Sequence, residues 1–150
     1  MHYLQILAAV NDLYLKGSKA ITEGLSLFDT ERVNIEAGQE WAAARFAGNE
    51  PAARLCNEYP NAGVYVLNLR QHPHDLIRWQ ETALYAARQL HDRRGEGNHL
   101  GNLGNAYKNL GEIEKAREFM EAALKIFEEI ESPNANIVRR NLEKLRGESE

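Results

Sequence analysis

Residues 98–112 read NHLGNLGNAYKNLGE, and this stretch decides the fold. Its large residues Leu100, Leu103 and Tyr107 recur every three or four positions, which is the spacing of one face of an α-helix. Gly101 and Gly104 lie between them, and residues this small allow a second helix to approach closely. The stretch therefore predicts a helix that packs tightly against a neighbouring helix.

Helical periodicity continues over nearly the whole chain, and no long strand-like run of Val, Ile and Thr interrupts it. The expected helices cover residues 4–15, 18–28, 30–46, 51–71, 74–90, 94–110, 112–130 and 133–147. Ser18, Asp29-Thr30 and Ser132-Pro133 offer the side chains with which helices begin. Pro60 removes an amide donor, so we expect a kink or a break near Tyr59-Pro60. The predicted fold class is all-α.

Composition and charge narrow the possible functions. The chain has 150 residues, of which 43% are hydrophobic, and a formal charge of −4 with both signs mixed. Arg93-Arg94 and Arg139-Arg140 lie beside acidic residues, so no basic surface for nucleic acid is expected. No apolar run is long enough to cross a membrane, and the single cysteine, Cys56, fits a reducing compartment. We expect a cytoplasmic protein that binds neither nucleic acid nor membrane.

An internal repeat appears in the second half of the chain. The segment WQETAL at residues 79–84 recurs forty residues later as FMEAAL at residues 119–124. Both place a large residue one turn before Ala-Leu, so a bulky side chain and a close helix contact repeat together. Repeats of this length indicate stacked helix pairs.

One segment resembles the tetratricopeptide repeat (TPR) family. The spacing of the family signature falls on Leu100, Leu103, Gly104, Tyr107, Gly111, Ala116 and Ala123. The phrase at residues 101–107 and the forty-residue period look like the longer-helix variant of kinesin light chains, spindle-orientation adaptors and many bacterial regulators. Leu100 stands where the family often has Trp, and Met120 where it often has an aromatic residue. The resemblance implies a right-handed superhelix of stacked helix pairs, about eight helices here.

The domain organisation expected from this resemblance is a single TPR-like domain over residues 1–150. Residues 1–71 would form divergent helix pairs, residues 73–131 the clearest repeats, and residues 133–147 a capping helix. The outer face of that last helix would carry Arg139, Arg140, Glu143 and Lys144.

A second resemblance covers the first half. The segments GLSLFD at 24–29, NIEAGQ at 34–39 and LRQHP at 69–73 look like the C-terminal TPR sensor region of bacterial signal-transduction ATPases of the STAND or NB-ARC type. No phosphate-binding loop is present, so the resemblance implies sensing or self-association without ATP hydrolysis. An exposed apolar face at Tyr3, Leu7 and Val10 would support this alternative, because it would have packed on an upstream module.

The candidate binding site is a row of asparagines. Asn98, Asn102, Asn105 and Asn109 recur at spacings of four, three and four, although Asn is a poor helix former. In the resembled family the first helix of each pair lines a concave groove, so these carboxamides would contact a protein or peptide ligand there. Lys108, Tyr65 and Asn68 would extend the groove. The alternative is a solvated polar face with hydrogen bonds between helices.

Other clusters do not indicate chemistry. His72-Pro73-His74-Asp75 lacks the spacing of common zinc sites and is better explained as a turn and helix start. Cys56 beside Leu55 is typical of a small buried hydrophobe. Trp41, Trp79, Phe119 and Phe127 are expected in the core. We therefore expect no catalytic residue, metal or cofactor, and a non-catalytic scaffold whose partner is a protein or peptide.

Overall fold

A computed structural model describes the backbone of residues 1–149 and the side chains of residues 1–147. Eight α-helices make up this described part. They are α1 (His2–Leu15), α2 (Lys19–Ala43), α3 (Glu50–Ala62), α4 (Val64–Arg70), α5 (Pro73–Gln89), α6 (Arg93–Asn109), α7 (Ile113–Glu129) and α8 (Asn134–Ser149).

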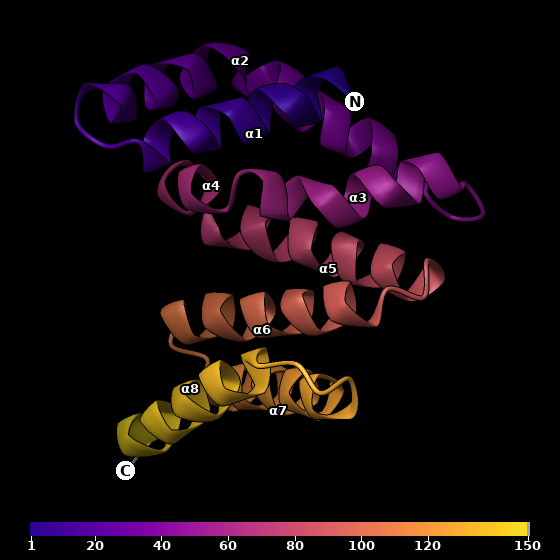
Figure 1. Ribbon diagram of the computed structural model, residues 1–150, viewed down its shortest axis with the longest axis vertical. Helices are drawn as coiled ribbons and strands as arrows, with labels where there is room; N and C mark the ends of the chain where they lie inside the picture. Colours follow the sequence, from indigo (N-terminus) through magenta and orange to yellow (C-terminus); the bar gives the residue numbers. More distant parts are fainter. Residues whose placement is uncertain (150) are drawn as a thin grey trace.

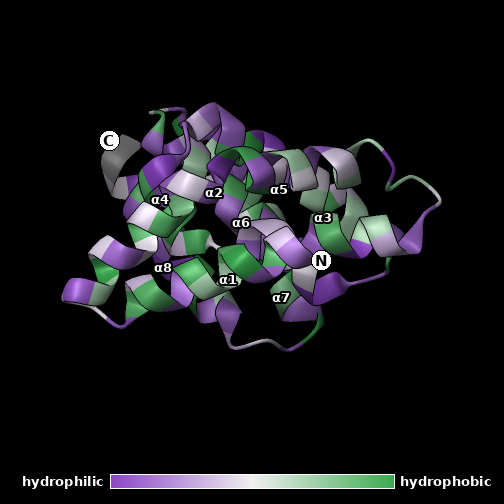
Figure 2. Cartoon of the chain, turned by 90° about the horizontal axis from the view of Figure 1, so that it is seen from above, coloured by the Kyte–Doolittle hydropathy of each residue, from purple (hydrophilic) through white to green (hydrophobic). Residues whose placement is uncertain are grey.

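The helices stack in chain order from α1 and α2 at one end to α7 and α8 at the other (Figure 1). The pairs α1 with α2, α3 with α5, and α6 with α7 pack closely, and α8 packs on α7. Hydrophobic and hydrophilic residues alternate around the helices (Figure 2), so each helix buries one face. Two large apolar clusters, one within α1–α5 and one within α5–α8, form the core. The expected all-α fold of stacked helix pairs is confirmed.

The second helix is longer than the sequence indicated. Asp29-Thr30 was expected to start a new helix, but α2 runs without interruption through both residues, so that expectation is wrong. The Thr30 hydroxyl donates to the Ser26 carbonyl 3.0 Å away, four residues earlier in the same helix, and Asp29 pairs with Arg70 of α4. Ser18 does occupy the N-cap position of α2, but its side chain makes no capping hydrogen bond.

The segment expected as one helix over residues 51–71 is broken at Gly63, between α3 and α4. The break lies three residues after the expected point at Pro60. A Cβ atom on Gly63 would lie 2.3 Å from a methyl carbon of Leu7, so α1 packs against the backbone here. The buried Asn11 side chain accepts hydrogen bonds from the amides of Tyr65 and Val66, at 3.0 and 3.4 Å. Because Asn11 satisfies the free amides at the start of α4, a second helix can begin there.

Trp41 was expected in the core, and that expectation is wrong. Half of its surface is exposed on α2, and the Arg45 guanidinium carbon lies 4.9 Å above its ring. Trp79 is buried instead, with Tyr59 edge-on to it at a centroid distance of 5.8 Å. Phe127 is also buried.

The two ends of the array are covered in different ways. Leu7 and Val10 are fully buried among α1–α5, so they present no free apolar face to an upstream module. At the other end, the Ser132 hydroxyl oxygen accepts a hydrogen bond from the Asn134 amide, 3.2 Å away, at the start of α8. Helix α8 buries Val138 and Leu145.

Candidate functional site: a carboxamide-lined groove

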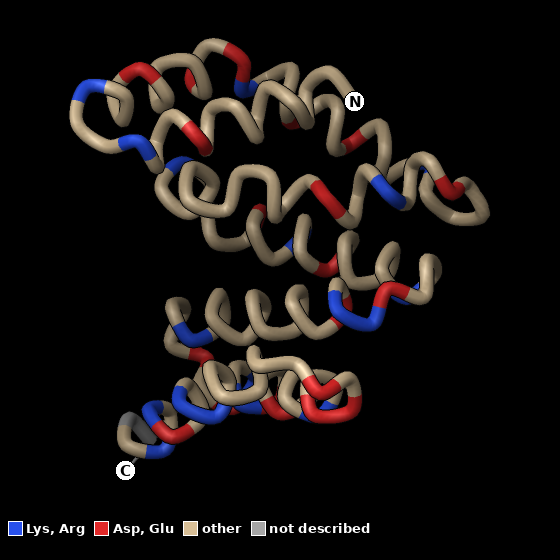
Figure 3. Tube along the Cα trace, viewed as in Figure 1, with Lys and Arg blue, Asp and Glu red and all other residues tan. Residues whose placement is uncertain are grey.

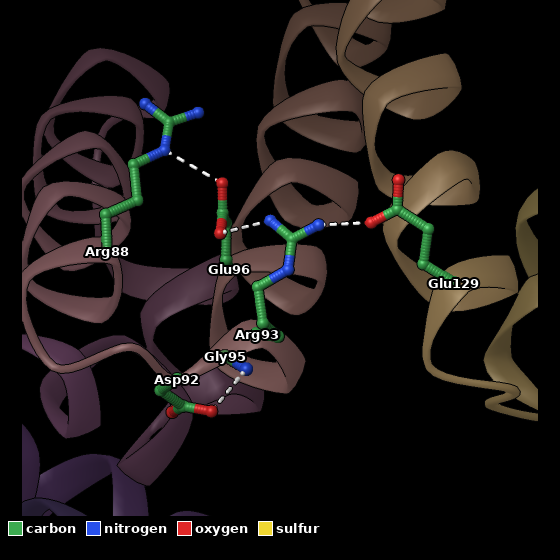
Figure 4. Close-up of polar contacts among 6 residues, drawn as sticks. All are labelled: Arg88, Asp92, Arg93, Gly95, Glu96 and Glu129. Atoms are coloured by element: carbon green, nitrogen blue, oxygen red, sulfur yellow. Dashed lines mark hydrogen bonds and ion pairs between the residues drawn. The ribbon is translucent and has the colours of Figure 1, made fainter.

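Helix α6 carries the candidate site, and its first turn is anchored on both sides. The Asp92 carboxylate caps the helix by accepting from the Gly95 amide at 2.9 Å. Glu96 accepts from Arg88 of α5 and from Arg93, each at 2.9 Å, and Arg93 pairs with Glu129 of α7 (Figure 4). This chain of ion pairs crosses three successive helices, so it fixes α6 between α5 and α7.

Close contact between α6 and α7 depends on glycine. A Cβ atom on Gly104 would lie 2.6 Å from Cγ of Met120, and one on Gly97 would lie 2.7 Å from the Phe127 ring. A Cβ on Gly101 would have its nearest neighbour 4.0 Å away, which is ordinary contact. The close packing expected at Gly101 and Gly104 therefore applies to Gly104.

Two pockets lie along α6. The α4–α6 pocket has a volume of about 360 Å³ and is lined by Val64, Asn68, Gln71, Pro73, Leu76, Gln80, Asn102, Asn105, Ala106 and Asn109. The α6–α8 pocket has a volume of about 130 Å³ and is lined by Gly97, Asn98, Gly101, Asn102, Asn105, Met120, Phe127, Asn134, Ile137, Val138 and Asn141. Both include Asn102 and Asn105, so we treat them together as the groove.

The four asparagines of α6 all line the groove, together with Asn68 of α4. Within the described part of the chain, the side chains of the four form no hydrogen bond with another residue. Hydrogen bonds between helices thus do not account for the row. Asn105 and Asn109 are exposed, and Asn98 and Asn102 are half-buried, so ligand can reach them from solvent.

Two residues proposed for the site lie elsewhere. Tyr65 and Lys108 are not among the residues that line either pocket of the groove. The Tyr65 ring stacks on Tyr14 of α1 with a centroid distance of 6.2 Å, and its side chain is half exposed. Asn68, three residues after Tyr65 in α4, does line the groove.

The groove is electrically neutral. Among the described residues that line its two pockets, none is Lys, Arg, Asp or Glu. Figure 3 shows the charged residues of α6 at its two ends, with the turns between them free of charge. A larger pocket of about 690 Å³ near the α5–α6 turn is lined differently, with Glu50, Arg54, Glu58 and Asp92 among its residues.

A buried polar network supports the wall of the groove. His99 is fully buried, with Nδ1 2.8 Å from Oε1 of Gln80 and Nε2 2.7 Å from Oδ1 of Asn57. Asn57 in turn donates to Asp92 at 2.9 Å. Burial lowers the pKa of His99 from 6.5 to about 4, although the Asp92 charge opposes the shift. Burial alone would raise the pKa of Asp92, but hydrogen bonds from Gly95 and Asn57 bring it below its usual value.

Sequence reasoning missed four carboxamides of the groove. Gln71 follows α4, Gln80 lies on α5, and Asn134 and Asn141 lie on α8. The two residues of α8 are seven positions apart, which is two helical turns, and that spacing could have placed them on one face. Gln71 and Gln80 have no comparable pattern, since their place in the groove depends on how α4, α5 and α6 meet.

The remaining polar candidates have structural roles. His72 caps α5, its Nδ1 accepting from the His74 amide at 3.2 Å, and Asp75 pairs with Arg78. Cys56 is buried, and burial raises the pKa of its thiol to about 11, so little reactive thiolate forms at neutral pH.

The geometry of α4–α7 agrees with a comparison against known families. Residues 65–129 match the family model described as tetratricopeptide repeat, and this match runs from the start of α4 to the end of α7. A search of curated proteins finds none that matches the chain. Across the described residues, no helix has both the length and the apolar character needed to span a bilayer. Residues 65–129 are thus a tetratricopeptide-repeat segment, of a kind that generally mediates binding between proteins and is typically non-catalytic.

Proposed function

We propose that this chain is a non-catalytic scaffold whose groove holds an extended segment of a partner protein. The tetratricopeptide-repeat match supports the general role in protein binding. We place the binding site in the groove. Its central row is formed by Asn98, Asn102, Asn105 and Asn109, with Asn68 beside them.

The observation that carries this proposal is the row of unpaired asparagines on α6. Replacing Ala by Asn costs a helix roughly 0.5 kcal/mol per residue, and these four side chains recover nothing through internal hydrogen bonds. A carboxamide both donates and accepts, so each can pair with the backbone N–H and C=O groups of a bound chain. We therefore infer that the row is suited to binding a ligand rather than to stabilising the helix.

The length of the row sets the length of the bound segment. Asn98 and Asn109 are eleven residues apart, which corresponds to about 16 Å along a helix at ~1.5 Å per residue. An extended peptide rises about 3.3 Å per residue. The central row would then contact about five ligand residues.

We also propose that all eight helices form one array, with α8 closing it and contributing Asn134 and Asn141 to the groove. A sensor segment of a larger ATPase, docked through Tyr3, Leu7 and Val10, is less favoured. Leu7 and Val10 are already buried against the chain's own helices.

The test uses peptides selected from a displayed library of random dodecamers, with the affinity of the best binders measured by calorimetry. Asn102→Ala with Asn105→Ala should retain the helical signal and weaken binding at least tenfold. Asn34→Ala, on the exposed face of α2 outside the groove, is the control and should change nothing. Equal affinity of the double variant and the wild type would contradict the proposed site.

A further inference from the structure

The side-chain oxygen of Gln71 lacks a partner. Among the described side chains it is the one buried nitrogen or oxygen atom without a hydrogen bond. Gln71 is 7% exposed and sits directly after α4, where its backbone amide donates to the Leu67 carbonyl at 2.8 Å. Buried polar atoms in native proteins are nearly always paired, so an orphan acceptor at a pocket wall points to a donor that arrives with a ligand.

The α4–α6 pocket surrounds this residue with similar groups. Six of its ten lining residues carry a carboxamide, namely Asn68, Gln71, Gln80, Asn102, Asn105 and Asn109, and none carries a charge. Gln80 is held by His99 from behind, so its position is fixed by the buried network. The pocket is thus polar, neutral and rich in groups that donate and accept.

These features exclude most ligand side chains. A buried Lys or Arg would find no carboxylate in the lining to pair with it, and an unpaired buried charge is strongly unfavourable. A carboxylate would have no cation in the lining to pair with. Its oxygens only accept hydrogen bonds, so they could not pair with the Gln71 oxygen. An apolar side chain would leave the Gln71 oxygen unpaired. Neutral side chains that donate a hydrogen bond remain. Among them, a carboxamide offers two N–H donors and a separate acceptor oxygen, which best matches a lining of carboxamides.

We propose that the α4–α6 pocket receives an asparagine or glutamine side chain of the bound segment, which donates its N–H to the Gln71 oxygen. The ligand carboxamide oxygen then accepts from an asparagine of α6. The Gln71 oxygen is buried, so the side chain rotates about its soft last torsion when a donor binds. This inference rests on the proposed function, and it makes the partner segment uncharged and carboxamide-bearing.

The experiment is a double-mutant cycle on peptides selected from the displayed dodecamer library. The selected sequences should share one position enriched in Gln or Asn. Replacing that residue by Leu in the peptide, or Gln71→Met in the protein, should each lower the affinity about tenfold. Combining the two should lower it little further, because both remove the same hydrogen bond. Gln89→Met is the matched control, since its side chain lies outside the groove and donates to the Phe46 carbonyl.

The outcomes separate this inference from the proposed function. The carboxamide assignment is overturned if the two replacements act independently, or if the selected peptides show no preference for Gln or Asn. In either case, weaker binding by the variant Asn102→Ala with Asn105→Ala still supports the groove as the binding site. If those asparagine replacements also have no effect, or if no peptide is selected, both proposals are overturned. The peptide replacement is measured on the wild-type protein, so the cycle does not depend on Gln71→Met alone.

The salt dependence of binding is a further test. The affinity should change less than twofold between 50 and 500 mM salt, as expected for a neutral groove. A steep salt dependence would count against an uncharged ligand segment.

Discussion

The imidazole Nδ1 of His99 lies 2.8 Å from the side-chain oxygen of Gln80, a residue that also lines the groove. On its other side, the ring meets the Asn57 oxygen, whose orientation is set because the Asn57 amide nitrogen donates to Asp92. The neutral ring carries one N–H, so it donates to one of these two side-chain oxygens and lies within hydrogen-bond distance of both. Protonation of this histidine is thus linked to both folding and the groove wall.

Stability should fall in acid because of His99. Its pKa is about 4 in the folded protein and 6.5 ordinarily, so between these values the unfolded chain binds a proton that the folded chain does not. The stabilisation is complete above pH 6.5 and is lost as the pH falls to about 4, up to about 3 kcal/mol.

Urea unfolding of the wild type and of His99→Gln between pH 7 and pH 4 measures this contribution. The wild type should lose more stability than the variant over that range. His74→Gln is the control, since it removes an exposed histidine outside the buried network. Parallel curves for the wild type and His99→Gln would exclude the assigned role.

Gly104→Ala should destabilise the protein by about 1–3 kcal/mol, because the added methyl overlaps Met120 at the α6–α7 contact. Gly101→Ala is the matched control on the same helix. Its methyl meets only ordinary contact, so it should be neutral or stabilising by up to about 1 kcal/mol. Thermal melts of both variants check this, and equal melting temperatures would argue against close packing at Gly104.

Glu96→Gln should cost about 1–3 kcal/mol, because one nearly buried carboxylate serves both Arg88 and Arg93. Glu50→Gln removes a carboxylate from an exposed pair with Arg54 and should change stability by less than about 0.5 kcal/mol. Chemical denaturation gives both values. A cost for Glu96→Gln no larger than for Glu50→Gln would show that the ion-pair chain does not fix α6.

Asn11→Ala should destabilise the array by about 1–3 kcal/mol, since it frees the buried amides that begin α4. Hydrogen exchange at Tyr65 and Val66 should accelerate in the variant. Asn61→Ala, at an exposed position of α3, should leave both measurements unchanged. Unchanged protection at Val66 in Asn11→Ala would mean that another group caps α4.

The boundaries of α5 to α8 could be predicted from sequence because their signals are local. His72-Pro73, Gly111 and Ser132-Pro133 act on neighbouring backbone, and each lies beside a helix end in the structure. The row of asparagines was visible for the same reason, since a single helix places Asn98 and Asn102 one turn apart.

The break before α4, the exposure of Trp41 and the place of Gln71 depend on which helices pack together. Local patterns in a single sequence do not show that packing. The cap of α4 comes from Asn11, more than fifty residues earlier, so the break shifted from Pro60 to Gly63. Trp41 is amphipathic and lies beneath Arg45 at the surface, although its size suggested the core. Gln71 joins the groove only through the meeting of α4 with α5 and α6.

The most direct test of the groove is an NMR titration of the ¹⁵N-labelled protein with a selected dodecamer. The account predicts that the side-chain NH₂ signals of Asn98, Asn102, Asn105 and Asn109 shift most, together with the backbone amides of α6. The signal of Asn34 on α2 should stay in place. Shifts confined to α2, or to the charged pocket near the α5–α6 turn, with the four asparagine signals unchanged, would contradict it.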